Sequence, residues 1–359
     1  MSTPSGVSTP SGTSIITGTK RVLVTGCAGE LGRRLVARLA TESWVKEVVG
    51  VDRHCLAGTW PKLEAHTFDL EAPDAAEELA ALGKGASTLV HLAWSPSPGP
   101  NLDILRAVTY AAEAIEPSQL VFMSSATVYG AWPDNPVPLT EDVEPRPNPQ
   151  FTYAVQKRAA ELALERWAAQ DDRPGVAILR PACAVGPLEQ PLYRALTVSG
   201  RSSNERMVQY LHVDDLAAAV VHAIEHDLAG VFNVAPDAGI PEDIARALVG
   251  GTAGLPLPAR LRGLVVHARS THDSLTGRRW PAGSKPYASN TWVVAADKLK
   301  MTGWAPEYSS EEALVVTDQR PHWDDLSQSK RVGVTLGATA ALAGVVAAGG
   351  AALVRSRRS

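Results

Sequence analysis

The stretch TGCAGELG, residues 25–32, decides the fold of this chain. The apolar run KRVLVTG before it, residues 20–26, is typical of a buried strand, and ELGRRLVARLAT, residues 30–41, has the spacing of a helix. Glycines 26, 29 and 32 permit a tight turn, let the backbone approach a pyrophosphate and bring helix and strand close. The helix N-terminus adds free N–H groups and a partial positive charge. The stretch therefore predicts a dinucleotide-binding loop.

Further apolar runs follow this loop along the chain. They are EVVGVD (47–52), STLVHLA (87–93), QLVFMSS (119–125) and GVAILRP (175–181). Helical stretches, among them 101–116 and 152–170, separate these runs. The alternation predicts an α/β fold with a parallel sheet covered on both faces, which binds its ligand at the carboxyl ends of the strands.

Asp52 ends the run EVVGVD at the expected distance from the glycine loop. Its carboxylate can accept hydrogen bonds from the ribose hydroxyls of an adenosine and would repel a 2′-phosphate, which favours NAD over NADP. Arg33 and Arg53 keep NADP open as the alternative, since a guanidinium beside the ribose could accommodate that phosphate.

YAVQK, residues 153–157, places a phenol and an ammonium four residues apart. On a helix the two side chains share a face, and the Lys157 charge should lower the pKa of Tyr153 and make the phenol a general acid/base. The spacing alone also occurs in amphipathic helices whose tyrosine packs and whose lysine is solvated. The surrounding sequence must therefore decide.

Several motifs occur in order along the chain. Besides the glycine loop and YAVQK, they are HLA (91–93), SSATVYG (124–130), LRP (179–181), YLHVDDLA (210–217) and WAPEYSSEEAL (304–314). On these motifs the chain resembles the extended short-chain dehydrogenase/reductase superfamily, in its NAD-dependent epimerase/dehydratase branch. The resemblance covers about residues 20–318. It implies a Rossmann-like, doubly wound parallel sheet with a smaller C-terminal substrate-binding lobe.

The resemblance also implies the site. Tyr153 would exchange a proton with a substrate hydroxyl or carbonyl, Lys157 would lower its pKa and hold the nicotinamide ribose, and Ser125 would hydrogen-bond the same substrate oxygen. Cofactor contacts are expected from Gly26, Gly29, Glu30, Leu31, Gly32, Asp52, Arg53, Asp69, Leu70, Leu92, Ala93, Tyr153, Lys157 and Pro181, and no metal is expected. Asp214 and Asp215 are expected to cap a helix rather than to act in catalysis.

The chain departs from the family pattern near the substrate. Ala126 and Thr127 stand where family dehydratases carry an acidic pair, which argues against a 4,6-dehydratase. Cys183 and Val208 stand where sugar-nucleotide epimerases usually carry an asparagine and an arginine that grips the diphosphate. Arg206 is the candidate substitute for that arginine.

The two ends of the chain differ from the middle. Residues 1–19, rich in Ser, Thr, Pro and Gly, are expected to be disordered. Beyond a linker at 319–331, residues 332–354 contain no charged side chain, and a basic tail follows at 355–359. Roughly 23 residues would just span a bilayer core of about 30 Å, which predicts a transmembrane segment. A buried or loosely docked helix is the alternative.

Composition limits the location and the partners of the protein. The chain has 359 residues and a formal net charge of −4, so it lacks the positive electrostatic field that would attract nucleic acid. Its three cysteines lack the spacing of a disulfide framework or of metal ligands. Without an N-terminal secretory signal, the catalytic part is expected in the cytoplasm, tethered to the inner face of the cell membrane by a tail anchor. The resemblance also implies a homodimer that forms through the YAVQK helix.

These observations predict an NAD-dependent epimerase or oxidoreductase that acts on a secondary alcohol of a small molecule. The first hypothesis is epimerisation of a sugar or nucleotide-sugar. A membrane-associated dehydrogenase of 3β-hydroxysteroid-like or lipid alcohols is the alternative. A third hypothesis, of another class, is a non-catalytic NAD-binding sensor or scaffold, against which the intact Ser125, Tyr153 and Lys157 count.

Overall fold

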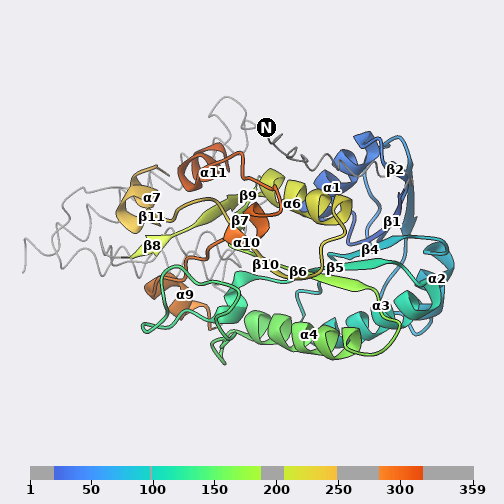
Figure 1. The fold of residues 1–359 in the computed structure, drawn as a ribbon, viewed down its shortest axis with the longest axis horizontal. Helices are drawn as coiled ribbons and strands as arrows, with labels where there is room; N and C mark the ends of the chain where they lie inside the picture. The colour runs from blue at the N-terminus through green and yellow to red at the C-terminus, as the bar shows by residue number, and fades with distance from the viewer. Residues whose placement is uncertain (1–19, 98, 187–205, 249–282, 318–359) are drawn as a thin grey trace, which may run out of the picture. The chain divides into compact units, whose positions relative to one another are not determined.

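A seven-stranded parallel sheet forms the centre of the fold (Figure 1). The computed structural model describes residues 20–97, 99–186, 206–248 and 283–317. The strand order is β10-β6-β5-β4-β1-β2-β3. The strands are β1 (Lys20–Thr25), β2 (Val45–Asp52), β3 (Leu63–Thr67), β4 (Thr88–His91), β5 (Gln119–Met123), β6 (Gly175–Pro181) and β10 (Gly230–Val234). The predicted α/β class with a parallel sheet is confirmed.

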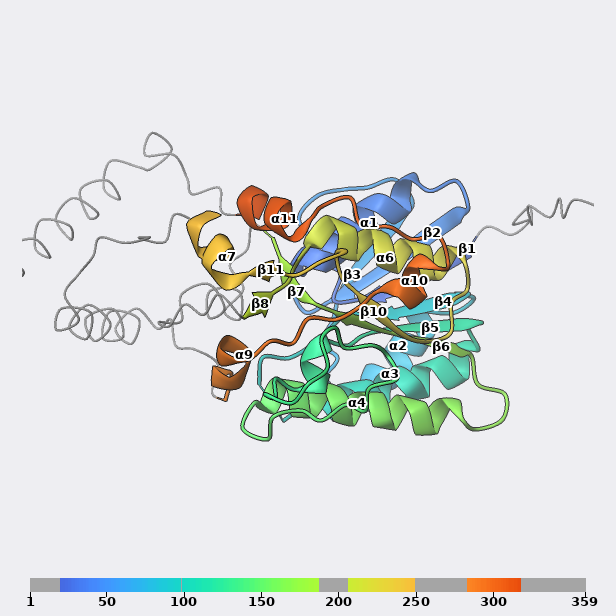
Figure 2. The same cartoon turned by 60° about the vertical axis from the view of Figure 1, so that its left-hand side comes forward.

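Helices cover both faces of this sheet (Figures 1 and 2). Helices α1 (Glu30–Thr41) and α6 (Val213–Glu225) pack together on one face, and α2 (Ala75–Leu82), α3 (Asn101–Ile115) and α4 (Thr152–Ala168) line the other. Along β1, Val22 and Val24 belong to one core layer, whereas Leu23 belongs to the opposite one. Successive side chains of the strand point to opposite faces of the sheet, and both faces are buried. The strand therefore has an unbroken apolar sequence.

The sheet places the ends of β1 and β4 at the point where the strand order reverses. β1 pairs with β2 on one side and with β4 on the other, and all three run parallel. The connections after β1 and β4 leave the sheet in opposite directions, which opens a crevice at the carboxyl ends of these strands. The glycine loop follows β1 directly and so lies at this crevice.

A smaller lobe is built from segments that follow β6 in the sequence. β7 (Cys183–Val185) pairs in parallel with β9 (Tyr210–His212), and β8 (Met207–Val208) pairs antiparallel with β11 (Ile240–Pro241). The helices that follow are α7 (Glu242–Leu248), α9 (Lys285–Ser289), α10 (Asp297–Lys300) and α11 (Ser310–Thr317). A single 3₁₀ turn, η1 (Ala126–Tyr129), follows β5 in the main domain.

The predictions for the chain ends lie outside the described residues. These are the disordered segment 1–19, the linker 319–331, the transmembrane segment 332–354 and the basic tail 355–359. Within the four described ranges, no helix combines the length and the apolar character needed to cross a membrane.

Candidate active site

The glycine loop packs as tightly as its sequence predicts. Gly26 has φ +79°, and a Cβ built on it would lie 2.6 Å from the Ala93 backbone nitrogen. A Cβ on Gly32 would lie 2.1 Å from the Gly26 carbonyl oxygen. The first glycine thus allows the turn after β1 to pass close to the end of β4, and the second lets α1 pack on the strand.

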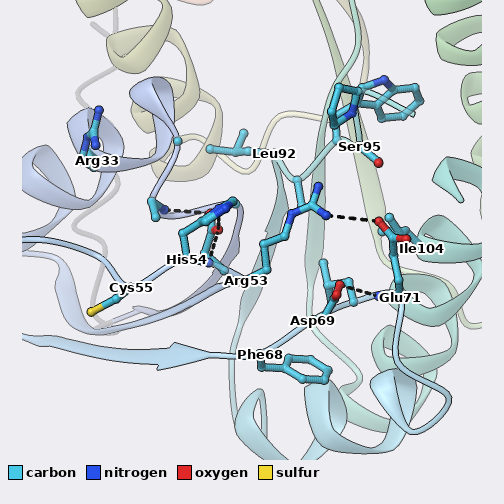
Figure 3. Close-up of a pocket in the computed structure, with 18 residues that line it drawn as sticks. Arg33, Arg53, His54, Cys55, Phe68, Asp69, Glu71, Leu92, Ser95 and Ile104 are labelled. Carbon is cyan, nitrogen blue, oxygen red and sulfur yellow. Dashed lines mark hydrogen bonds and ion pairs between the residues drawn. The ribbon is translucent and has the colours of Figure 1, made fainter. Parts of the chain in front are cut away.

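A cavity of about 590 Å³ opens beside this loop at the crevice (Figure 3). Of the residues predicted to contact a cofactor, it is lined by Gly26, Gly29, Asp52, Arg53, Asp69, Leu70, Leu92 and Ala93. Arg33, named above as a possible receptor for the 2′-phosphate of NADP, also lines it. The remaining wall residues were not predicted from the sequence, namely Ala28, His54, Cys55, Phe68, Glu71, Trp94, Ser95, Pro96 and Ile104. Residues from the ends of β1, β2, β3 and β4 therefore converge on one cleft.

Asp52 is held rigidly at the edge of this cleft. Its two carboxylate oxygens accept hydrogen bonds from the Ala28 backbone N–H (3.0 Å) and the His54 backbone N–H (2.9 Å). Each oxygen keeps a further lone pair, so the carboxylate can still accept hydrogen bonds from ribose hydroxyls. The glycine turn, the cleft and this acceptor together fit the adenosine and pyrophosphate parts of a dinucleotide.

Glu30, Leu31, Gly32 and Pro181 do not line the cavity, although cofactor contacts were predicted for them. Their environments explain why. The Glu30 carboxylate packs against Gly186, where a Cβ would lie 2.1 Å from its Oε1 atom, and Leu31 packs against the apolar core. Pro181 pairs with Val234 at the end of β6.

Tyr153 and Ser125 meet beside a second cavity, of about 250 Å³. Tyr153 lines it together with Trp94, Ser95, Pro96, Thr152 and Gln156, and the first three of these also line the larger cavity. The Ser125 hydroxyl interacts with the Tyr153 phenol and accepts hydrogen bonds from Thr127 Oγ1 (2.9 Å) and the Thr127 backbone N–H (3.2 Å). The predicted acid/base therefore lines the smaller cavity and contacts its partner serine.

The electrostatics of Tyr153 differ from the prediction. Burial raises its pKa to about 12, and the interaction with Ser125 opposes that rise only in part. The groups that shift the Tyr153 pKa do not include Lys157, whose own pKa is lowered by burial to about 7. The Lys157 ammonium donates a hydrogen bond to the Met123 carbonyl (2.7 Å) and lies 5.8 Å from the centre of the Tyr153 ring.

Trp94 covers Lys157, a contact that the sequence analysis did not predict. The Lys157 Nζ atom lies 3.6 Å from the centre of the Trp94 indole ring, whose edge meets the ring of Tyr153. An ammonium over an aromatic face is attracted electrostatically, most strongly when it is buried. The local sequence indicates this contact only through the position of Trp94, which directly follows the HLA motif.

A buried polar network lies next to the predicted catalytic residues. Arg180 on β6 donates hydrogen bonds from Nε (2.9 Å) and Nη2 (2.8 Å) to the two carboxylate oxygens of Glu161. Glu161 lies one helical turn after Lys157 and also accepts a hydrogen bond from the Ser124 hydroxyl. Arg180 donates a further bond to the Tyr129 hydroxyl (2.9 Å). The network therefore joins β6, α4 and the segment that carries Ser125.

On the substrate side, Arg206 is paired within the smaller lobe. It is buried, its Nη1 atom lies 3.0 Å from Glu242 Oε2, and its Nη2 donates to the Tyr287 carbonyl (2.9 Å). Its guanidinium is therefore committed within the lobe. Cys183 and Val208 are buried as well, and burial raises the pKa of the Cys183 thiol to about 12.

Asp214 and Asp215 lie in the first turn of α6, but the predicted capping role is wrong. The His212 side chain accepts the capping hydrogen bond, from the Asp214 N–H. Asp214 instead pairs with Arg34 (2.6 Å), and Asp215 accepts hydrogen bonds from the backbone N–H groups of residues 307 and 308. Among the residues that the structure describes, no group of three or more His, Cys, Asp or Glu side chains could hold a metal ion.

Comparisons with known proteins agree with this fold and cleft. The family model "NAD dependent epimerase/dehydratase family" matches residues 22–235. An uncharacterized protein of Mycobacterium tuberculosis is 30% identical over 323 residues, which cover 82% of each chain. A ceramide reductase of Caulobacter vibrioides is 30% identical over 215 residues, 56% of this chain and 59% of the reductase. The UDP-glucose 4-epimerase structure from Thermotoga maritima aligns with a TM-score of 0.62 and 21% identity, over 83% of this chain and 97% of that one.

Proposed function

Since this chain belongs to the NAD-dependent epimerase/dehydratase family, we propose that it transfers a hydride between NAD and the carbon of a secondary alcohol. The observation that supports this proposal is the contact of Ser125 and Lys157 with Tyr153, which lines a cavity that shares Trp94, Ser95 and Pro96 with the larger cleft. In the proposal Tyr153 is the proton donor and acceptor, and NAD is preferred over NADP because Asp52 stands at the end of β2.

In the proposed reaction each side chain has its own role. Bound NAD supplies the hydride acceptor. Tyr153 takes the proton of the alcohol as the carbon is oxidised and returns it in the reverse direction. Because Thr127 donates two hydrogen bonds to the Ser125 oxygen, the Ser125 hydroxyl acts as a donor, toward the Tyr153 phenol in this structure and toward the substrate oxygen in the proposed reaction. A protonated Lys157 beside Tyr153 favours the phenolate that forms when the tyrosine gives up its proton.

The first candidate reaction is epimerisation of a sugar or nucleotide-sugar alcohol. It is supported by the membership of the family and by the intact Ser125, Tyr153 and Lys157. In this reaction the hydride returns to the opposite face of the same carbon, so NAD must stay bound through a full cycle.

The second candidate is the dehydrogenation or reduction of a lipid alcohol or ketone. A specific observation favours it, namely that Arg206 is already paired with Glu242 and is not offered to a diphosphate. The similarity to a ceramide reductase over 215 residues points the same way. In this reaction the cofactor leaves after each turnover and must be exchanged.

The nucleotide released from the purified protein on denaturation distinguishes the two reactions. The nucleotide is identified by its mass, and its amount is compared with the amount of protein. About one NAD per chain supports the epimerase, and sugar nucleotides are then the substrates to assay. A site that is empty as purified but binds added NAD supports the dehydrogenase, and lipid alcohols are then tested as reductants of NAD. A protein that neither contains nor binds NAD contradicts both. The homodimer, the membrane attachment through residues 332–354 and the cytoplasmic location stay predictions.

A further inference from the structure

Arg53 and Glu71 form an ion pair across the adenosine end of the larger cavity (Figure 3). Arg53 follows β2 and Glu71 follows β3, and their Nη1 and Oε1 atoms lie 3.4 Å apart. Both side chains are about two-fifths exposed and both line the cavity. The pair lies on the same wall as Asp52, which is the predicted acceptor for the ribose hydroxyls.

The backbone at Glu71 is held in place by a turn. The Glu71 backbone N–H donates a hydrogen bond to Asp69 Oδ1 (3.0 Å), and the Ala72 N–H donates to the Asp69 carbonyl (3.0 Å). A carboxyl side chain that bonds the backbone two residues ahead fixes a turn. Glu71 therefore presents its charge to Arg53 from a defined position rather than from a freely moving loop.

This arrangement bears on the choice between the two nicotinamide dinucleotides. NADP differs from NAD by a phosphate on the adenosine ribose, and a free arginine beside the ribose is the usual receptor for that group. Here Arg53 already has an anionic partner, so an incoming 2′-phosphate must displace Glu71 and also approach a second carboxylate, Asp52. Arg33 is the other guanidinium in the cavity wall, and it stands after the glycine loop rather than after β2.

We propose that Glu71 is a specificity-determining residue that excludes NADP by occupying Arg53. This inference rests on the proposed function in assuming that a nicotinamide dinucleotide binds in this cleft. Asp52 alone would disfavour the phosphate by repulsion. Glu71 adds a second, separable effect, because it removes the cation that would otherwise offset that repulsion.

The test is a comparison of dissociation constants for the full-length protein. NAD and NADP are titrated into the wild type and into the Glu71→Gln variant by isothermal calorimetry without substrate. Exposed ion pairs are weak, so we expect the Kd for NADP to fall by about three- to tenfold and the Kd for NAD to stay within about twofold. Glu77→Gln, which removes the same charge from an exposed position on α2, is the matched control and should change neither constant.

A double-mutant cycle isolates the contribution of the pair. In the Glu71→Gln, Arg53→Gln variant the gain in NADP affinity should disappear, because the receptor itself has been removed. An unchanged NADP constant in Glu71→Gln overturns the inference, and so does a gain that survives in the double variant. Both of these results leave the proposed function standing if the wild type binds NAD. A wild type that binds neither nucleotide overturns the proposed function, and the inference falls with it.

Discussion

Replacing Arg180 with methionine should strongly destabilise the protein. The guanidinium donates two hydrogen bonds to Glu161, and the side chains of the pair are 3% and 0% exposed. Removing it leaves the Glu161 charge buried beside two remaining cations, the less buried Arg158 at 3.2 Å and Lys157, and it removes the bond to the Tyr129 hydroxyl. Breaking a buried pair from one side costs about 3–5 kcal/mol. For a folded unit of this size that corresponds to a loss in Tm on the order of 10 °C.

The assay is thermal and urea unfolding of the full chain at pH 7, followed by circular dichroism. Arg146→Met is the control, since Arg146 and Asp134 form an ion pair whose side chains are 55% and 70% exposed. That change should cost less than about 1 kcal/mol. The double variant Glu161→Leu, Arg180→Met should recover most of the lost stability, because neither charge of the pair is left buried without the other. A cost for Arg180→Met as small as that of the control would refute the reasoning.

Three further predictions concern the site. Tyr153→Phe should abolish turnover while the Kd for NAD, measured by calorimetry, stays within about twofold, and undiminished turnover would overturn the mechanism. Gly32→Ala should lower the free energy of unfolding by about 1–3 kcal/mol and weaken NAD binding, because its Cβ would lie 2.1 Å from the Gly26 carbonyl oxygen. Urea unfolding measures the first effect and calorimetry measures the second. His91 is kept neutral, since burial and then Lys157 lower its pKa to about 3, so its stability contribution is complete above pH 6.5 and is lost as the pH falls towards 3. His91→Gln should reduce the slope of stability against pH by about 0.7 kcal/mol per pH unit at pH 6.5 and by about 1.4 kcal/mol per unit near pH 5, and equal slopes in urea unfolding would contradict this.

The sequence predicts the parts of the fold that rest on local patterns. The run at 20–26 and the glycines after it identify β1, the turn and the start of α1, because burial on both faces demands an unbroken apolar strand. β3 was missed because it is an edge strand with the polar sequence LEAHT, and every residue in it is at least partly exposed. β10 was missed because it is short and its partner β6 lies far away in the sequence.

The same distinction holds for the site. The spacing of Tyr153 and Lys157 is local and places both on one helix, as predicted. Their pKa values are not local, because Lys157 is buried under Trp94 and against the end of β5, and Tyr153 interacts with Ser125. The pairing of Arg53 with Glu71 likewise joins the ends of two neighbouring strands, and the pairing of Arg206 with Glu242 depends on how the smaller lobe folds. No spacing rule along the chain predicts such contacts.

Trp94 has a consequence for how such an enzyme can diversify. Its indole belongs to both cavities, so a substitution there changes the fit of the nucleotide and of the alcohol together. A substitution at position 94 that is selected for a new alcohol substrate is therefore pleiotropic, because it also changes how long the cofactor stays bound. Thr152 and Gln156 line only the smaller cavity. We expect the substrate range of this lineage to evolve through those two positions while the tryptophan is retained, and saturation mutagenesis scored separately for nucleotide binding and turnover would measure that difference.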